Sequence, residues 1–312
     1  MPDIILHHYP TSPFSEKIRA ILGYKQLAWK SVHIPVVMPK PDLIALTGGY
    51  RKTPVMQIGA DIYCDSKLMV DVLERLKPDP PLLPCELAAS CAVWERWTEQ
   101  VLFFLTIPVV VQPAGLAHLF GSVPPAAVAG FQKDREALFA GGSARRPSMS
   151  ATQSELPPFL SQLDRQLAAT PFILGQQPTV ADFSVYHPIW FIHSNPGVAA
   201  YLQPYKHILA WVQRIAAFGH GTPERMSGEE AIHAARACRT RAGDSAAHAG
   251  PSGPQPGDEV TVSATDYGTD PVTGRLAKLS AGQISLSRSD ERAGEVVVHF
   301  PRAGFKLAVA KS

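Results

Sequence analysis

The segment Tyr9 to Arg19, with the sequence YPTSPFSEKIR, places a serine at the expected start of a helix that follows a strand. Ser12 has the N-cap position and Pro13 the first helical position, where the missing N–H is not needed. A hydroxyl there faces free backbone N–H groups and the positive end of the helix dipole, which favours an anion such as a thiolate. A free thiol has a pKa of about 8.5, so a modest lowering leaves it mostly ionised at neutral pH. The segment predicts an anion site, with simple helix capping as the alternative.

A second segment, Arg51 to Val55, carries a proline immediately before an expected strand. Pro54 is a candidate for a cis peptide bond in a tight turn, and a trans proline at a strand start is the alternative. A cis turn would leave the backbone N–H and C=O of Thr53 unpaired by its own sheet. Thr53 could then bind an extended peptide ligand in the manner of an added strand.

A third segment, Cys64 to Leu68, opens another helix with an acid and a serine. The Ser66 hydroxyl and the first free N–H groups of the helix could hold a carboxylate. Asp65 beside it could pair with an ammonium group. The pair therefore predicts a site for both ends of an α-amino acid, and an ordinary helix start is the alternative.

The elements that must position these residues alternate between strand and helix over residues 1–78. Apolar runs indicate buried strands, and apolar residues spaced three and four apart indicate helices. The expected order is β-α-β-α-β-β-α, with strands at 4–9, 29–34, 54–58 and 61–63, and helices at 13–22, 42–46 and 66–76.

The remaining chain divides into three parts by pattern. Residues 84–238 lack a convincing strand, and we expect an all-helical block there. Residues 239–257 are rich in Ala, Gly, Pro and Ser, a composition typical of a flexible linker. Residues 258–312 alternate between apolar and polar positions with glycine-containing turns. This pattern predicts a small antiparallel β-barrel of the SH3-like type.

Composition limits the class of protein. The chain has 312 residues, 46% of them hydrophobic and 18% charged, with a net charge of +2, so we expect a packed core and no nucleic-acid partner. The apolar run 101–111 is far shorter than the ~20 residues of a membrane-spanning helix, and the N-terminus lacks the pattern of a signal peptide. The cysteines show neither CxxC spacing nor the density of a disulfide scaffold. We expect a cytoplasmic protein with reduced thiols, no membrane association and no metal site.

The three segments together resemble the N-terminal domain of the cytosolic glutathione S-transferases. The match continues in residues 172–182, FILGQQPTVAD, which are similar to the family's signature before its sixth helix. There Thr179 and Asp182 have the spacing of a capping box. The resemblance covers residues 3 to about 235. It implies a thioredoxin-like α/β domain at 1–78 and a helical cosubstrate domain at 84–238, with the β-barrel at 258–312 as an addition of unknown role.

The resemblance also implies roles for individual residues. Ser12 matches the serine that stabilises the glutathione thiolate, although Ser15, one turn further, offers a second hydroxyl. The glutathione-binding set would be Lys40, Lys52, Thr53, Asp65 and Ser66, with Pro54, Thr179 and Asp182 as structural residues. Asp65 is one methylene shorter than the family's usual glutamate. Phe104, Val111 or Trp190 could line the pocket for a second substrate.

The leading hypothesis is a glutathione transferase that joins glutathione, as cosubstrate, to a hydrophobic electrophile. The family resemblance implies a homodimer. One alternative is a glutathione-binding or protein-interaction scaffold with little catalysis, in which the C-terminal barrel recruits a protein partner. Another is a glutathione-dependent isomerase or dehalogenase. For the barrel, docking against the body of the transferase and recruiting a partner both remain open.

Overall fold

The computed structural model describes residues 3–238 and 253–310. Its N-terminal part has the expected order of elements: β1 (Ile4–His8), α1 (Pro13–Tyr24), β2 (Ala28–His33), α2 (Pro41–Thr47), β3 (Val55–Ile58), β4 (Asp61–Cys64) and α3 (Ser66–Leu76). Strand β1 pairs in parallel with β2 and antiparallel with β3, and β3 forms a hairpin with β4. The thioredoxin-like α/β domain expected at the N-terminus is confirmed.

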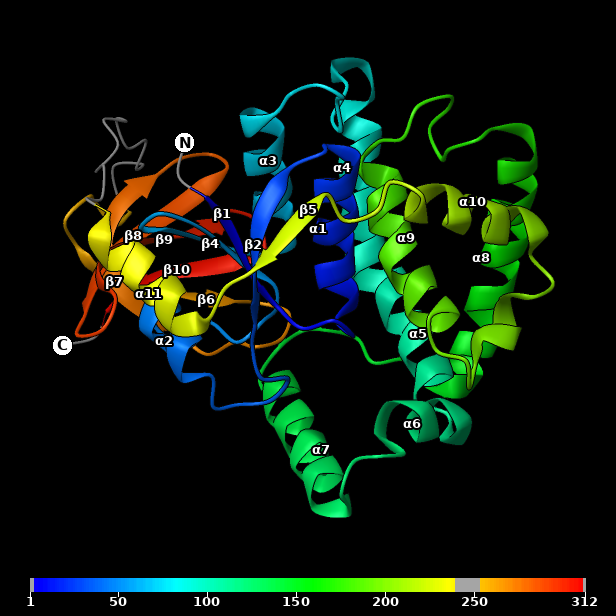
Figure 1. Ribbon diagram of the computed structural model, residues 1–312, viewed down its shortest axis with the longest axis horizontal. Coiled ribbons are helices and arrows are strands. Elements are labelled where there is room, and N and C mark those ends of the chain that lie inside the picture. Colours follow the sequence, from blue (N-terminus) through cyan, green and yellow to red (C-terminus); the bar gives the residue numbers. More distant parts are fainter. Residues whose placement is uncertain (1–2, 239–252, 311–312) are drawn as a thin grey trace.

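Both faces of this sheet are covered, which explains why every residue of β1 is buried. Successive strand residues point to opposite faces, so Leu6 packs into one hydrophobic core and Ile5 into another. The core around Leu6 includes residues of α1, α3 and the helical domain. The core around Ile5 includes residues of α2, α11 (Gly228–Ala237) and the C-terminal strands. Figure 1 shows α2 and α11 together on the side of the sheet opposite the large helical domain.

The middle of the chain is helical, as expected, and includes two short 3₁₀ turns at Cys85–Leu87 and Ala199–Leu202. A π-helical turn, Thr98–Leu102, joins the first two of its α-helices. The α-helices that precede α11 are α4 (Ala88–Trp97), α5 (Phe103–Val110), α6 (Pro113–Phe120), α7 (Pro125–Phe139), α8 (Met149–Ala169), α9 (Val180–His193) and α10 (Lys206–Ala216).

One strand interrupts the helical block, contrary to the expectation of an all-helical 84–238. Strand β5 (Thr222–Arg225) pairs in parallel with β2 at the edge of the sheet. All four of its residues are exposed, so it has no alternation of apolar and polar side chains. The pairing is made by its backbone, which explains why the sequence pattern gave no sign of it.

The capping box at the start of α9 is present. The Asp182 carboxylate accepts hydrogen bonds from the Thr179 backbone N–H (2.9 Å) and the Ile173 backbone N–H (2.9 Å). It also accepts a hydrogen bond from the Trp211 indole N–H (3.0 Å). Asp182 is fully buried, and it therefore joins α9 to α10 and to the preceding turn as well as capping its own helix.

The C-terminal β unit is present and has five antiparallel strands. They are β6 (Glu259–Ala264), β7 (Val272–Leu279), β8 (Gln283–Asp290), β9 (Gly294–Pro301) and β10 (Phe305–Val309). Strand β9 pairs in parallel with β4, so one sheet runs through both parts in the order β10-β6-β7-β8-β9-β4-β3-β1-β2-β5. Of the linker expected at 239–257, residues 239–252 lie outside the described residues.

Polar contacts reinforce this junction. The His299 ring joins three strands, with Nε2 2.8 Å from Asp61 Oδ1 on β4 and Nδ1 2.9 Å from Ser285 Oγ on β8. Arg288 donates a hydrogen bond to the Ala45 carbonyl oxygen of α2 (2.6 Å), and Arg292 pairs with Asp42 at the start of α2 (2.7 Å). The described part of the C-terminal unit is thus docked against the N-terminal domain, which is one of the two roles left open by the sequence.

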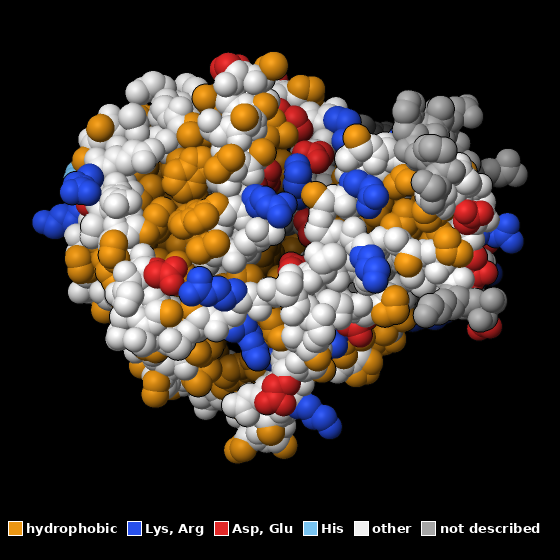
Figure 2. Space-filling view, turned by 180° about the vertical axis from the view of Figure 1, so that it is seen from behind, with side chains coloured by type: hydrophobic (Ala, Val, Ile, Leu, Met, Phe, Trp, Pro, Cys, Tyr) orange, Lys and Arg blue, Asp and Glu red, His pale blue; other side chains and the backbone are white. Residues whose placement is uncertain are grey.

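The surface seen from behind carries mixed side chains. Figure 2 shows hydrophobic side chains gathered over part of this face and a hollow near its middle, with Lys or Arg and Asp or Glu side chains close to the rim. Within residues 3–238 and 253–310, no single helix is long and apolar enough to cross a membrane. The helical stretch Cys85–Val110 and the helix α6 (Pro113–Phe120) are together long and apolar enough to cross a membrane, but the two are bent by 86° relative to each other.

Candidate functional site

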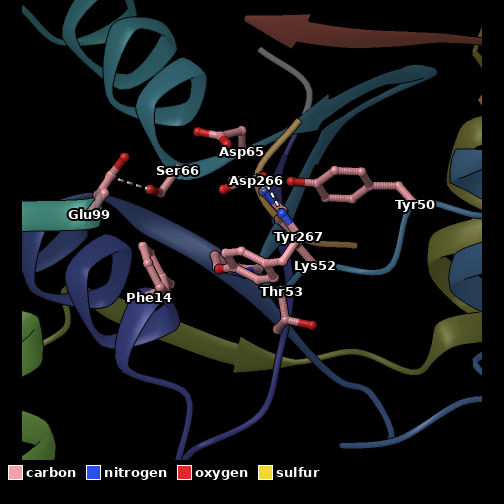
Figure 3. Close-up of a pocket in the computed structure, with 10 residues that line it drawn as sticks. Phe14, Tyr50, Lys52, Thr53, Asp65, Ser66, Glu99, Asp266 and Tyr267 are labelled. Carbon is pink, nitrogen blue, oxygen red and sulfur yellow. Dashed lines mark hydrogen bonds and ion pairs between the residues drawn. The ribbon is translucent and has the colours of Figure 1, made fainter. Parts of the chain in front are cut away.

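A pocket lies where the N-terminal domain, the helical domain and the C-terminal β unit meet (Figure 3). Five residues singled out in the sequence line it: Lys52, Thr53, Pro54, Asp65 and Ser66. The structure therefore brings the second and third sequence segments together in one place. The other lining residues are Phe14, Tyr50, Glu99, Asp266 and Tyr267.

The Thr53 backbone forms one wall of the pocket. The Thr53–Pro54 peptide bond is cis, and the pairing of β3 with β1 and β4 begins at Val55. Thr53 therefore lies just before the strand ladder, at the edge of the pocket. Its side-chain hydroxyl accepts a hydrogen bond from the Lys40 ammonium (3.1 Å), and Lys40 itself does not line the pocket. Burial, followed by the nearby Arg135, lowers the pKa of Lys40 to about 8.

Asp65 and Ser66 form a second wall at the start of α3. Asp65 has a φ of +79°, a conformation rare for residues other than glycine, and its carboxylate accepts a hydrogen bond from the Lys67 N–H (3.0 Å). Such backbone strain is frequently concentrated at functional sites. Burial raises the pKa of the Asp65 carboxyl, and the neighbouring Glu99 carboxylate raises it further. A cation placed between these two acids would relieve their repulsion.

Glu99, from the π-helical turn, reaches Ser66 across the pocket (Figure 3). The Ser66 hydroxyl donates a hydrogen bond to Glu99 Oε1 (3.1 Å). The same oxygen accepts a hydrogen bond from the Lys17 ammonium (3.0 Å), which also bonds Glu95 (3.0 Å). Burial would lower the pKa of Lys17, but the Glu99 and Glu95 carboxylates outweigh burial and raise it. A buried lysine on α1 thus fixes the acidic side of the pocket.

The third wall comes from the connection between β6 and β7. The Asp266 carboxylate accepts a hydrogen bond from the Lys52 ammonium (2.6 Å), and this ammonium lies 4.2 Å from the centre of the Tyr267 ring. Tyr267 stacks on Phe139 of α7 (5.0 Å between ring centres) and meets Phe104 of α5 edge-on (5.9 Å). Residues of the C-terminal unit therefore complete the pocket.

The two serines at the start of α1 lie outside the lining of this pocket. The Ser12 hydroxyl accepts a hydrogen bond from the Ser15 backbone N–H (3.2 Å), as expected for an N-cap, and Ser12 is 2% exposed. Ser15 is fully buried, and its hydroxyl has no hydrogen-bond partner among the described residues. Phe14, between them in sequence, is the α1 residue that faces the pocket.

Comparison with known proteins places the chain in a family. Residues 6–81 match the model of the glutathione S-transferase N-terminal domain, and residues 140–218 match that of the glutathione S-transferase C-terminal domain. A solved structure of a GST-like protein from Pseudomonas syringae is 37% identical, with a TM-score of 0.81. The similarity covers 99% of this chain and 100% of that one. The chain belongs to the glutathione S-transferase family.

Other solved glutathione S-transferases share the fold with this family member at lower identity. One from Rhodospirillum rubrum F11 is 17% identical with a TM-score of 0.51, and the similarity covers 69% of this chain and 88% of that chain. Glutathione S-transferase III in apo form is 21% identical with a TM-score of 0.51, and the similarity covers 69% of this chain and 92% of that chain. The similarity to the Pseudomonas syringae protein, in contrast, extends over nearly the whole chain.

Sequence reasoning missed several residues of this transferase-family pocket. Glu99 had a signal that could have identified it, because Glu95 and Glu99 stand four apart in an apolar-rich helical stretch, and acids are seldom buried without partners. Asp266 and Tyr267 had no local signal, because their importance depends on a contact with Lys52 more than 200 residues away. Of the three residues suggested for the second-substrate pocket, Phe104 contacts Tyr267, whereas Val111 and Trp190 do not line this cavity.

Within the described parts of the chain, no group of three His, Cys, Asp or Glu side chains is placed to hold a metal ion.

Proposed function

We propose that this protein binds glutathione in the pocket and joins it, through its thiol sulfur, to a hydrophobic electrophile. The observation that carries the proposal is the convergence of Thr53, Asp65 and Ser66 on one cavity beside the N-terminus of α1. These residues supply a strand-like backbone edge, an acid for an ammonium group and a helix start for a carboxylate. Glutathione carries the matching groups in the matching order.

The γ-glutamyl end of glutathione would bind beside α3. Its ammonium group would lie near the Asp65 and Glu99 carboxylates. Burial, and after it the neighbouring Glu99 carboxylate, raises the pKa of Asp65, and a cation there would offset both effects. Its carboxylate would accept hydrogen bonds from the Ser66 hydroxyl and from the first free N–H groups of α3. The ligand would then replace Ser66 as a hydrogen-bond donor to Glu99.

The cysteinyl unit would pair with the Thr53 backbone, which directs the thiol toward the start of α1. There the Ser12 hydroxyl and the positive end of the helix dipole would stabilise the thiolate. The thiolate would then attack an electrophilic carbon of the second substrate, so that a C–S bond forms while a carbon–halogen bond breaks and releases halide, or a carbon–oxygen bond of an epoxide opens. The aromatic rings of Phe14 and Tyr267 line the pocket and offer an apolar surface for such a substrate, and the buried Phe104 contacts Tyr267.

Turnover and binding, measured separately on Ser12→Ala, test the proposed mechanism. We expect the variant to bind glutathione with nearly unchanged affinity and to lose turnover of a haloaromatic electrophile by about 10²-fold or more. Ser15→Ala is the matched control, because its hydroxyl is one turn further along the same helix. Full turnover in Ser12→Ala together with its loss in Ser15→Ala would assign the mechanism to the other hydroxyl.

A second candidate function is glutathione binding without catalysis. The burial of Ser12 and its role as helix cap favour it, because a hydroxyl outside the pocket lining has no contact with a ligand there. Glutathione binding without turnover across haloaromatic, epoxide and cis-alkene substrates would support this candidate.

We also propose that the chain forms a homodimer, as the family resemblance implies. Val93 on α4 is a large apolar side chain with 67% of its surface exposed, next to Trp94 in sequence. Val93→Asp should shift the sedimentation coefficient from that of a dimer toward that of a monomer. An unchanged monomer in both proteins would remove the dimer from the proposal.

A further inference from the structure

The basic residue nearest the Thr53 edge of the pocket is already neutralised by an acid. Lys52 is paired with Asp266 at 2.6 Å, and only 11% of its side chain is exposed. The Tyr267 ring covers the same ammonium group at 4.2 Å. The family resemblance implies that Lys52, and less surely Lys40, lies near the glycyl carboxylate of glutathione. Asp266 already holds the Lys52 ammonium group that such a carboxylate would need.

The charges that line the pocket also disfavour a free carboxylate at the Lys52 end. Three carboxylates line it, from Asp65, Glu99 and Asp266, against the single ammonium of Lys52 among the described lining residues. Glu99 is already paired with the Lys17 ammonium, and an ammonium group of the ligand would balance Asp65. A ligand with a further free carboxylate at the Lys52 end would face Asp266 at close range, and like charges placed together disfavour binding.

Tyr50 adds an unused hydrogen-bonding group at this end of the pocket. Its side chain is 4% exposed, and its hydroxyl has no hydrogen-bond partner among the described residues. In Figure 3 this hydroxyl points toward Asp266 and Lys52. Burial of an unpaired phenol is unfavourable, so a ligand atom that formed a hydrogen bond with this hydroxyl would remove that cost.

We propose that the site selects a glutathione-type thiol whose glycyl carboxyl group is neutral, as in an amide, over free glutathione. The inference rests on the proposed function and specifies its ligand. Tyr50 would donate a hydrogen bond to the amide carbonyl oxygen, and Asp266 would accept one from the amide N–H. Asp266 and Tyr50 are then the residues that determine specificity, because they distinguish a neutral from a charged glycyl end of the ligand.

Lys40 does not restore a site for the free carboxylate. It lies outside the pocket lining and donates its hydrogen bond to the Thr53 hydroxyl. Figure 3 shows the Thr53 side chain pointing away from the Lys52–Asp266 pair. Lys40 is also 4% exposed, and the nearby Asp134 carboxylate is already paired with Arg51 and Arg135.

Calorimetric titration with glutathione and with its glycine amide tests the inference. The wild-type protein should bind the amide about tenfold or more tightly than glutathione. Asp266→Asn should raise the affinity for glutathione and bring the ratio close to one, because an asparagine side chain donates a hydrogen bond to a carboxylate. Asp270→Asn is the matched control, because it removes a charge from the same connection outside the pocket, and it should keep the wild-type ratio.

Tyr50→Phe provides an independent variant. Because the hydroxyl is buried without a partner in the protein, its removal should leave the melting temperature unchanged or raise it. It should weaken binding of the amide more than binding of glutathione. An equal or higher wild-type affinity for glutathione, or the same ratio in Asp266→Asn, overturns the inference and leaves the proposed function standing. Binding of neither ligand to any variant overturns the proposed function and the inference with it.

Discussion

Asp182 supports more of the fold than a helix cap does, and its replacement should show this. Its carboxylate accepts hydrogen bonds of 2.9–3.0 Å from the Thr179 N–H, the Ile173 N–H and the Trp211 indole N–H, and the residue is fully buried. A capping residue alone is worth about 0.5–2 kcal/mol. Asp182→Ala also leaves buried donors without partners, each worth about 1–3 kcal/mol. We therefore expect a loss of at least about 3 kcal/mol in the free energy of unfolding.

A matched comparison isolates the effect of burial. Asp164 accepts two hydrogen bonds from the backbone N–H groups of His207 (2.8 Å) and Ile208 (2.9 Å) at the start of α10, but it is partly exposed. Water can replace its carboxylate, so Asp164→Ala should cost about 0.5–2 kcal/mol. Urea unfolding followed by circular dichroism gives both values. A loss in Asp182→Ala no larger than that in Asp164→Ala would refute the reasoning.

Three further predictions concern the buried charges and the C-terminal unit. Lys17→Met should lower the free energy of unfolding by about 3–5 kcal/mol, because it removes the ammonium group that hydrogen-bonds the buried Glu95 carboxylate at 3.0 Å. Arg145→Met, at the exposed Arg145–Glu155 pair, should cost under about 1 kcal/mol in the same urea titration. Burial lowers the pKa of His7 from 6.5 to about 4, so its contribution to stability is complete above pH 6.5 and is lost as the pH falls toward 4. Melting temperatures from pH 7 to 4 should show this decline, and a smaller one in His7→Gln; equal declines would contradict the assignment. A chain that ends at residue 238 should lose the cooperative melting transition seen by circular dichroism, because β6–β10 cover the core that contains Ile5 and Val55. A truncated chain that melts like the full-length chain would contradict this prediction.

The elements and segments predicted from the sequence were those with local signals. The strands and helices of the N-terminal domain follow from the periodicity of apolar residues. The pairs Thr53–Pro54 and Asp65–Ser66 stand at element boundaries, where residue types typical of turns and helix caps can be recognised in the sequence. The structure places both pairs on the same pocket. The roles of individual residues in binding and catalysis stay predictions until a ligand is measured.

The missing parts of the site depend on contacts between distant segments. Asp266 has an ordinary turn sequence around it, and its importance comes from the pairing of β9 with β4, which brings the C-terminal unit to the pocket. That pairing is made by backbone atoms of strands whose sequences do not specify each other. Strand β5 escaped prediction for a similar reason, since its four exposed residues carry no apolar pattern.

The most direct test of the central claim is the melting temperature with and without glutathione. If about 10 mM glutathione is ten times its dissociation constant, binding adds about 1.4 kcal/mol and raises the melting temperature by a few degrees. We expect this shift in the wild-type protein and in Asp71→Asn, which removes a partly exposed acid of the same helix outside the pocket lining, and its loss in Asp65→Asn. No shift in the wild-type protein, or an equal shift in Asp65→Asn, would contradict glutathione binding through its γ-glutamyl end in this pocket.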